Sequence, residues 1–511
     1  MRSQVELQRE LVDKITEFAP LDEIRILLAC GAQVNGPVAE GLLPLHYAVH
    51  CNNVACVRLL LTRGSQVDRS DDAGYTALHL CSERGYVDVV RLLLDHNARV
   101  CFVDNEVESR QPFPVIYKSD EPLRLALDNG HYDCAQLLLE YGANPNARYF
   151  LGTELGRLLL ASTMDRPPPD ERLVELLLRY GADPNTTNRD GLTPLMSICR
   201  SRRVYHPTAV VIAQLLLQFG ADVNAEALNC PRRQNDRRTA LHYAIISRSL
   251  SLVELLLQHG ALFCMPKGYD RPTPLDLAVA AGDLSIVSTL LSLGADPNAA
   301  HTCMGTALHL ALAPSIGCQP LQSANVQRQL VQLLINFGAD VNATVQLEGG
   351  AFVRSPLVEF IRYSTARRNG GDGDADEEGT SQGQPPTIDP SGIVQLLLSH
   401  GVEVVMKSAQ KDPRGQLANL KALYLCGQRE LFELLVDFGE RYDGRAISRL
   451  AAEIGDSRLA ERAAQPLSLL HQCRLTIRRS LTPLDPEKVL LLPLPRNAQN
   501  YLLCSSRGQS P

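Results

Sequence analysis

Short apolar runs recur along the chain, and a turn signal closes each run. Examples are Val57–Leu61, Val89–Leu94 and Val253–Leu257, each with the spacing of a helix that buries one face. The turn signal is the phrase Gly-Ala-x-x-Asn, with full copies beginning at Gly31, Gly142, Gly181, Gly220, Gly294 and Gly338 and degenerate copies at Gly64, Asn97, Gly260, Gly401 and Gly439. Successive early copies lie 33 residues apart. A period of this length predicts a solenoid of stacked units.

A second phrase precedes each apolar run. It reads Thr-Ala-Leu-His or a close variant, and copies begin at Pro44, Thr76, Thr239, Thr273 and Thr306. A threonine hydroxyl caps a helix, and a proline in the first turn loses no hydrogen bond. The glycine ends the following helix in a left-handed conformation. Each unit is therefore predicted to be a helix–turn–helix with two apolar stacking faces, which is unstable alone.

Insertions interrupt the repeats at two kinds of position. Those predicted as enlarged loops between repeats are 102–120, 225–238 and 343–354. Those predicted between the two helices of one repeat are 162–172, 200–208, 314–327 and 366–390. The last contains the acidic run 370–386, which has almost no apolar residue and is expected to be a disordered loop. The atypical first unit, Gln4–Asn35, is expected to cap the array.

The segment Pro466–Leu503 does not repeat. A helical stripe is predicted from Leu469, Cys473 and Ile477, with Arg474, Arg478 and Arg479 off the stripe. A short helix at 486–491 and an extended stretch, Leu492–Pro495, are expected next, after which Tyr501, Leu502 and Leu503 resume an apolar surface. A terminal cap needs one apolar face only. The additional apolar element predicts a partner.

Composition narrows the class of protein. The chain has 511 residues, 45% hydrophobic and 21% charged, with a net charge of −7 and scattered basic residues. This excludes wholesale disorder and leaves no footprint for nucleic acid or an anionic membrane. The 14 cysteines form no zinc or disulfide spacing. Cys30, Cys81 and Cys134 are expected to pack as small hydrophobes in a reducing compartment. The first ten residues do not resemble a signal peptide, and no apolar run reaches the roughly 18 residues of a membrane span.

The candidate chemistry is sparse. His46, His79, His242 and His309 share one repeat position, which favours hydrogen bonding to the backbone between adjacent repeats over metal binding or catalysis. No nucleophile–base pair, phosphate loop or metal motif is found, so neither catalysis nor a cofactor is expected. The four arginines Arg232, Arg233, Arg237 and Arg238 are a candidate loop for an acidic client peptide, and an ordinary polar loop is the alternative.

These patterns resemble a known family. The Thr-Pro-Leu-His and Gly-Ala-x-x-Asn phrases resemble the ankyrin repeat, and Ser468-Leu469, Cys473 and Ile477 resemble the Elongin-binding motif of a SOCS box. The combination is typical of the ankyrin repeat and SOCS box (Asb) family. The resemblance implies that Leu469, Cys473 and Ile477 contact Elongin C. It also implies that Leu492, Pro493, Leu494 and Pro495 select a type-5 cullin with its RING partner, either by contact with the cullin or by shaping the box.

We therefore expect an all-α fold, an ankyrin-repeat solenoid with short hairpin loops followed by a small helical SOCS box. The expected divisions are an array at 1–463, the box at 464–505 and a polar tail at 506–511. The resemblance implies a non-catalytic substrate receptor that binds Elongin B, Elongin C and a protein client, located in the cytoplasm with the nucleus left open. A plain ankyrin scaffold or inhibitor that binds Elongins without a cullin is the alternative, and an enzyme with an unrecognised site is a second one.

Overall fold

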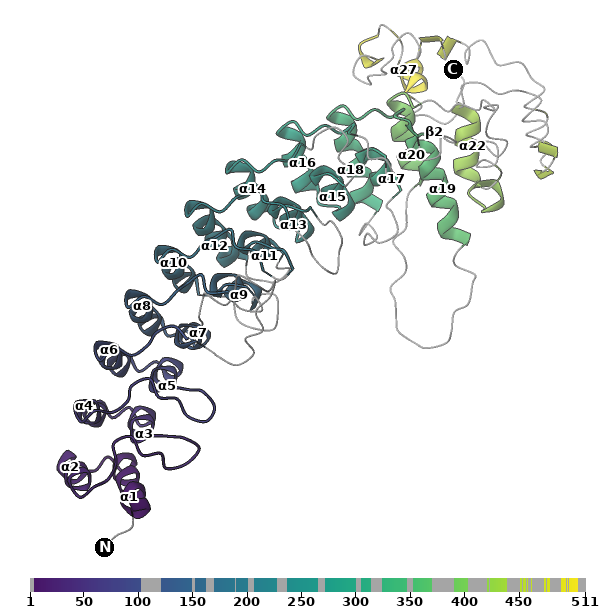
Figure 1. Ribbon diagram of the computed structural model, residues 1–511. Helices are drawn as coiled ribbons and strands as arrows, with labels where there is room; N and C mark the ends of the chain where they lie inside the picture. The colour runs from purple at the N-terminus through teal and green to yellow at the C-terminus, as the bar shows by residue number, and fades with distance from the viewer. Residues whose placement is uncertain are drawn as a thin grey trace. The chain divides into compact units, whose positions relative to one another are not determined.

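The computed structural model consists of helix pairs in two compact units, Met1–Ala261 and Leu262–Pro511 (Figure 1). Apart from single residues within these ranges, it describes residues 4–102, 121–148, 152–161, 170–200, 206–227, 237–264, 272–299, 305–313, 324–346, 353–369, 390–402, 421–438 and parts of 451–503. The all-α prediction is confirmed, with one minor addition described below.

Unit 1 contains fourteen helices among its described residues, in seven consecutive pairs. Their bounds are α1 Gln4–Thr16, α2 Leu21–Ala29, α3 Pro44–His50, α4 Val54–Thr62, α5 Ala77–Arg84, α6 Val87–Asp95, α7 Pro122–Asp128, α8 Tyr132–Glu140, α9 Glu154–Ala161, α10 Glu171–Arg179, α11 Pro194–Cys199, α12 His206–Gln218, α13 Ala240–Ile246 and α14 Leu250–Gln258. Unit 2 continues the pattern. Its named helices are α15 Pro274–Ala281, α16 Leu284–Ser292, α17 Ala307–Leu312, α18 Ala324–Asn336, α19 Pro356–Asn369, α20 Pro390–Ser399, α22 Arg429–Phe438 and α27 Arg496–Leu502.

The helices of each unit lie in two layers. Each odd-numbered helix from α1 to α13 packs against the next odd-numbered one, and the even-numbered helices of unit 1 do the same (Figure 1). Leucines fill the space between the layers, and Leu45, Leu60, Leu78, Leu93 and Leu138 are fully buried. Each buried side chain contributes about 1.5–3 kcal/mol relative to an exposed one. Each helix pair thus depends on its neighbours for most of its stability.

The recurrent histidine closes the start of its own helix. In α5, His79 Nδ1 lies 2.8 Å from Thr76 Oγ and accepts the Thr76 backbone N–H at 3.1 Å. The same pair of bonds joins Thr239 to His242 and Thr306 to His309. The single lone pair of each of these Nδ1 atoms accepts the backbone N–H, so it is not available to a metal. The structural role predicted for these histidines is present, although these Nδ1 bonds lie within one repeat rather than between repeats.

Several predicted loops are partly regular structure. Helices α12 and α18 each have 13 residues and begin inside the insertions predicted at 200–208 and 314–327. Helix α19 continues to Asn369, so the start of the loop predicted at 366–390 is helical, and its acidic residues lie outside the described part. The loop predicted at 343–354 contains an antiparallel hairpin of β1 (Val345–Gln346) and β2 (Val353–Arg354). In each case helix or strand bonds satisfy backbone groups that composition alone assigns to a loop.

An asparagine joins most of the described repeats to the next one. Asn35 donates from Nδ2 to the Gly64 carbonyl at 3.0 Å and accepts the Gln66 backbone N–H at 2.8 Å. The bond from the asparagine Nδ2 to a glycine carbonyl recurs within both units, from Asn146 to Gly181, Asn185 to Gly220, Asn224 to Gly260, Asn298 to Gly338 and Asn342 to Gly401. The last residue of the Gly-Ala-x-x-Asn phrase is therefore a connector between repeats, because an amide both donates and accepts.

Three of the described repeats lack this asparagine and have Asp68, Cys101 or Cys264 in its place. Asp68 occupies the position in one of them and only accepts, from the Arg99 backbone N–H at 2.7 Å. Cys101 occupies it in the next repeat, where its thiol lies 3.9 Å from the Gly142 carbonyl. A carboxylate has no proton to donate, and a thiol is a weak donor. The asparagine connection is therefore weakened at two consecutive junctions, those on either side of the α5–α6 pair.

A buried ionic cluster joins α7 and α9, where the threonine–histidine pair is absent. Arg157 forms ion pairs with Asp128 of α7 and, at 2.7 Å, with Glu154 of its own helix. Arg157 and Glu154 are both buried. Burial raises the pKa of Glu154, and the neighbouring Arg157 opposes that rise. Removal of one partner from such a cluster leaves an uncompensated buried charge.

Replacement of Asp68 by Asn is expected to stabilise the array. The new amide can donate to the Asn97 carbonyl, which occupies the place of the Gly64 carbonyl in the preceding repeat, and the expected gain is about 0.5–1.5 kcal/mol. The matched control, Asn35→Asp, removes a donor that is already used and should lower stability by a similar amount. Urea unfolding followed by circular dichroism measures both changes. An unchanged or lower midpoint for Asp68→Asn would contradict the role of the asparagine amide.

Replacement of Arg157 by Met is expected to destabilise unit 1 by about 3–5 kcal/mol, because Glu154 then remains buried without its counter-charge. The double variant Arg157→Met with Glu154→Gln should recover part of this loss, since the amide carries no charge. Thermal unfolding compares the variants. Equal destabilisation by the single and double variants would show that packing rather than charge explains the effect.

Candidate partner-binding surfaces

The C-terminal segment has a small core of its own. Val489, Leu502 and Leu503 are buried together, and Ile477 and Leu492 pack against them. Leu502 lies in α27, and Leu503 directly follows that helix. The prediction that Leu502 and Leu503 resume an apolar surface is therefore wrong, because both side chains fill this core.

A buried amide holds the turn before α27. Gln499 is buried and donates from Nε2 to the Leu490 carbonyl at 3.0 Å and to the Leu492 carbonyl at 2.9 Å. These two bonds tie the turn at Leu490 and Leu492 to α27. Sequence reasoning missed Gln499. The available signal was a single amide three residues before Leu502, on the same face of the helix.

The predicted stripe at 469–477 divides between the surface and the core. Leu469 lies outside the described residues. Cys473 is helical and exposed, whereas Ile477 is half-buried against the core. Arg474, predicted off the apolar stripe, is buried instead. The helix therefore presents Cys473 to the surface and turns Ile477 towards Val489, Leu502 and Leu503.

The Leu-Pro-Leu-Pro segment divides in a similar way. Leu492 is half-buried and packs against the core, and its carbonyl accepts the Gln499 amide. Leu494 is 37% exposed. Pro493 and Pro495 lie outside the described residues. Leu492 thus helps to form the segment, while Leu494 is available to a partner.

An exposed apolar strip lies beside this core. Leu490, Leu491 and Leu494 are all exposed, and Leu491 is 83% exposed. Within the helix predicted at 486–491, only Val489 to Leu491 are described, and Leu491 already forms a turn. Three exposed leucines within five residues are a feature of an interaction surface rather than of a solvated cap.

The arginine loop is closed at its base. Arg237 pairs with Glu226 at 2.7 Å, and the Ala227 backbone N–H donates to the Arg238 carbonyl at 3.0 Å. Arg232 and Arg233 lie outside the described residues. Arg237 therefore already has a carboxylate partner, and this lowers the number of arginines available to a client.

The cysteine prediction is confirmed for two of three residues. Cys81 and Cys134 are fully buried, and burial raises the pKa of both thiols, that of Cys134 to about 11. Cys30 is exposed at the end of α2, so its prediction is wrong. Across the part of the chain that the structure describes, no group of three His, Cys, Asp or Glu side chains is placed to hold a metal. The helices described there include none with the length and apolar character to cross a bilayer.

Family models match both parts of the chain. A model of three ankyrin repeats matches residues 17–104, 168–267 and 212–301, and a model of one ankyrin repeat matches 121–149. A SOCS box model matches 465–503, the segment that contains the small core. No curated protein matches the chain at a significant level.

Solved ankyrin domains are also similar to part of the chain. The crystal structure of the human ASB11 ankyrin repeat domain is 23% identical over 49% of this chain and 98% of that domain, with a TM-score of 0.36. The ankyrin repeat domain of Bcl-3, a member of the IkappaB family, is 25% identical over 48% of this chain and 97% of that domain, with a TM-score of 0.38. Since ankyrin repeats and a following SOCS box occur in one polypeptide, the chain belongs to the ankyrin repeat and SOCS box (Asb) family.

Proposed function

We propose that the protein is the substrate receptor of an Elongin B/C–cullin–RING ubiquitin ligase. The observation that carries this proposal is the SOCS box match at 465–503, behind an array of ankyrin repeats. The array holds a client protein, and the box recruits the ligase, which ubiquitinates the client and directs it to degradation. The protein itself contributes position only. A fixed client lies at high effective concentration near the ubiquitin-loaded enzyme.

The size of the box supports a need for partners. The matched segment has about 40 residues, and a domain of that size rarely folds stably by itself. Its described core contains three buried residues, while Leu490, Leu491 and Leu494 stay exposed. Burial of these leucines against a partner would stabilise the box and the complex at once. We accordingly propose an array at 1–463, a SOCS box at 464–505 and a polar tail at 506–511.

We propose Leu469, Cys473 and Ile477 as the Elongin C contacts. The exposed side chain of Cys473 supports a direct contact. Ile477 is half-buried against the box core, so it offers Elongin C only part of its surface and also positions the helix. The proposed role of Leu469 follows from the motif.

We propose the segment Leu492–Pro495 as the cullin-selecting element, with different roles for its two leucines. Leu494 contacts the type-5 cullin, supported by its exposure. Leu492 shapes the box, supported by its packing against the core. The proposed roles of Pro493 and Pro495 follow from the motif.

We propose that the client binds the array, and Arg232, Arg233 and Arg238 remain candidates for an acidic client segment. Arg237 is a weaker candidate because Glu226 pairs with it. The cytoplasm is the proposed compartment, with the nucleus left open. The alternative function is a scaffold or inhibitor that binds Elongins without a cullin, and co-purification of the cullin with the wild-type chain separates the two.

Replacement of Cys473 by Asp is expected to weaken co-purification with Elongins B and C at least about tenfold, which corresponds to about 1.4 kcal/mol. The reason is that the partner must bury a new charge without a counter-charge. Cys264→Asp is the matched control, since Cys264 is also exposed and lies outside the box. Quantitative affinity purification measures the loss. Unchanged Elongin recovery with Cys473→Asp would remove Cys473 from the interface.

Replacement of Leu494 by Asp is expected to abolish cullin recovery while Elongins B and C are retained. Replacement of Leu492 by Asp should lose both, because a charge placed against the box core disrupts the fold of the segment. The two variants make the same substitution at different leucines. Immunoblotting of the purified complexes compares the amounts of cullin and of Elongins B and C that each variant recovers. If Leu494→Asp also lost the Elongins, the two leucines would share one structural role.

A further inference from the structure

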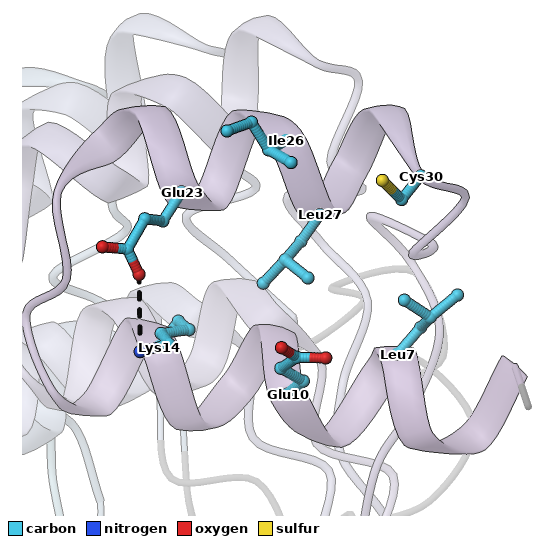
Figure 2. A pocket seen from close by; sticks show the side chains of 7 residues that line it. All are labelled: Leu7, Glu10, Lys14, Glu23, Ile26, Leu27 and Cys30. Carbon is cyan, nitrogen blue, oxygen red and sulfur yellow. Dashed lines mark ion pairs between the residues drawn. The ribbon is translucent and has the colours of Figure 1, made fainter. Parts of the chain in front are cut away.

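An open groove runs between α1 and α2, at the first helix pair of unit 1. It has a volume of about 550 Å³, and Leu7, Glu10 and Lys14 of α1 face Glu23, Ile26 and Leu27 of α2 across it (Figure 2). The spacing of each set places it along one face of its helix. A pocket of this volume can hold a small molecule. The groove is open along its length, however, and an elongated occupant fits it better.

The groove is the stacking face that the other repeats cover. Ile26 precedes Gly31 by five residues, and Leu59, Leu92, Leu137 and Leu176 hold the same position in the next four repeats. Those leucines are 3–8% exposed, whereas Ile26 is 60% exposed. The α1–α2 pair contacts the α3–α4 pair, and the described residues place no helix pair against its other face. The expected polar cap is therefore incomplete, and the shape of this face is that of a site for a packed helix.

Charge narrows the identity of such a helix. Between Gln4 and Ala29 there are six acidic and three basic residues, a net charge of −3. Lys14, the one cation among the groove residues, is engaged by Glu17 at 3.5 Å and Glu23 at 3.4 Å. The groove therefore favours a basic occupant. A second copy of this chain would bring the same negative face and repel.

We propose that the α1–α2 groove binds an amphipathic helix of a partner protein, with apolar residues against Leu7, Ile26 and Leu27 and with Lys or Arg residues along the acidic surface of the two helices. The helix replaces the neighbour that covers the equivalent face in other repeats. It is recognised by an i, i+3, i+4, i+7 apolar stripe. This inference rests on the array alone and holds whether or not the SOCS box recruits a ligase.

Two synthetic peptides of about 18 residues, about five helical turns, test the proposal. Both carry the same Leu stripe, flanked by Lys in one peptide and by Glu in the other. Fluorescence anisotropy with the full chain should detect binding of the Lys peptide, at least about tenfold weaker binding of the Glu peptide, and a loss of affinity of the Lys peptide as salt rises. The double variant Glu10→Lys with Glu23→Lys should reverse the preference.

Matched surface variants locate the binding. Ile26→Glu should weaken binding of the Lys peptide at least about tenfold. Leu262→Glu should leave that binding unchanged, since Leu262 lies in unit 2 and has the same exposure as Ile26, 60%. Because Ile26 is exposed, the variant should keep the circular dichroism of the parent. Three results would overturn the proposal: no binding of the Lys peptide, equal binding of both peptides, or equal loss from the two variants. Sedimentation could instead show that the protein forms a dimer and that Ile26→Glu dissociates it. That result would also overturn the proposal, because a second copy of the chain would then occupy the groove.

Discussion

Contact between neighbouring repeats is the interaction on which the rest of this structure depends. A pair of helices of seven to nine residues is too short to be stable in water. It becomes stable when the leucines between its layers are covered on both sides and when an asparagine such as Asn35 closes the turn of the next repeat. Stability is therefore a sum over adjacent pairs. Local changes such as Asp68 or Cys101 in place of Asn weaken one junction without altering the architecture.

The need for a neighbour on both sides also explains why apolar surface is exposed in the first helix pair and in the C-terminal box. An array of stacked pairs always exposes a stacking face at each end unless something covers it. At the start of unit 1 that face is the groove with the exposed Ile26. The C-terminal box has a core of only a few residues and exposes Leu490, Leu491 and Leu494. The surfaces that we assign to partners are thus those where the fold leaves apolar area uncovered.

Variation between repeats occurs where the backbone hydrogen bonds can be closed in another way. Asp276 replaces the histidine at the start of α15 and accepts the Thr273 backbone N–H at 2.9 Å, so a carboxylate and an imidazole serve the same cap. The starts of α7 and α9 lack the threonine–histidine pair, and the ion pairs of Arg157 with Asp128 and Glu154 join these two helices. Gln327, in the additional turn of α18, donates to the Ala311 carbonyl at 2.9 Å at the end of α17. An insertion can therefore stabilise the preceding helix.

The sequence by itself determined the repeat period, the helix pairs, the structural character of the recurrent histidines though not their partners, and the presence of a different C-terminal segment. These features are local and recur, because a capping threonine or a terminating glycine acts on its own turn. The Elongin-type motif could also be recognised from the sequence, because it is defined by the spacing of Leu469, Cys473 and Ile477. Sequence alone could not distinguish a cap from an open end at α1 and α2, because Ile26 and Leu59 read alike.

Only the tertiary structure decided which side chains of these motifs face inward. Cys473 and Ile477 lie one turn apart, yet Cys473 is exposed and Ile477 packs against Leu502 from a helix further along the chain. Leu492 and Leu494 divide in the same way, and Arg474 is buried although it lies off the apolar stripe. The reason is that periodicity defines a face of one helix, whereas burial depends on which other element covers that face. That element is distant in sequence, and its position is known only from the fold.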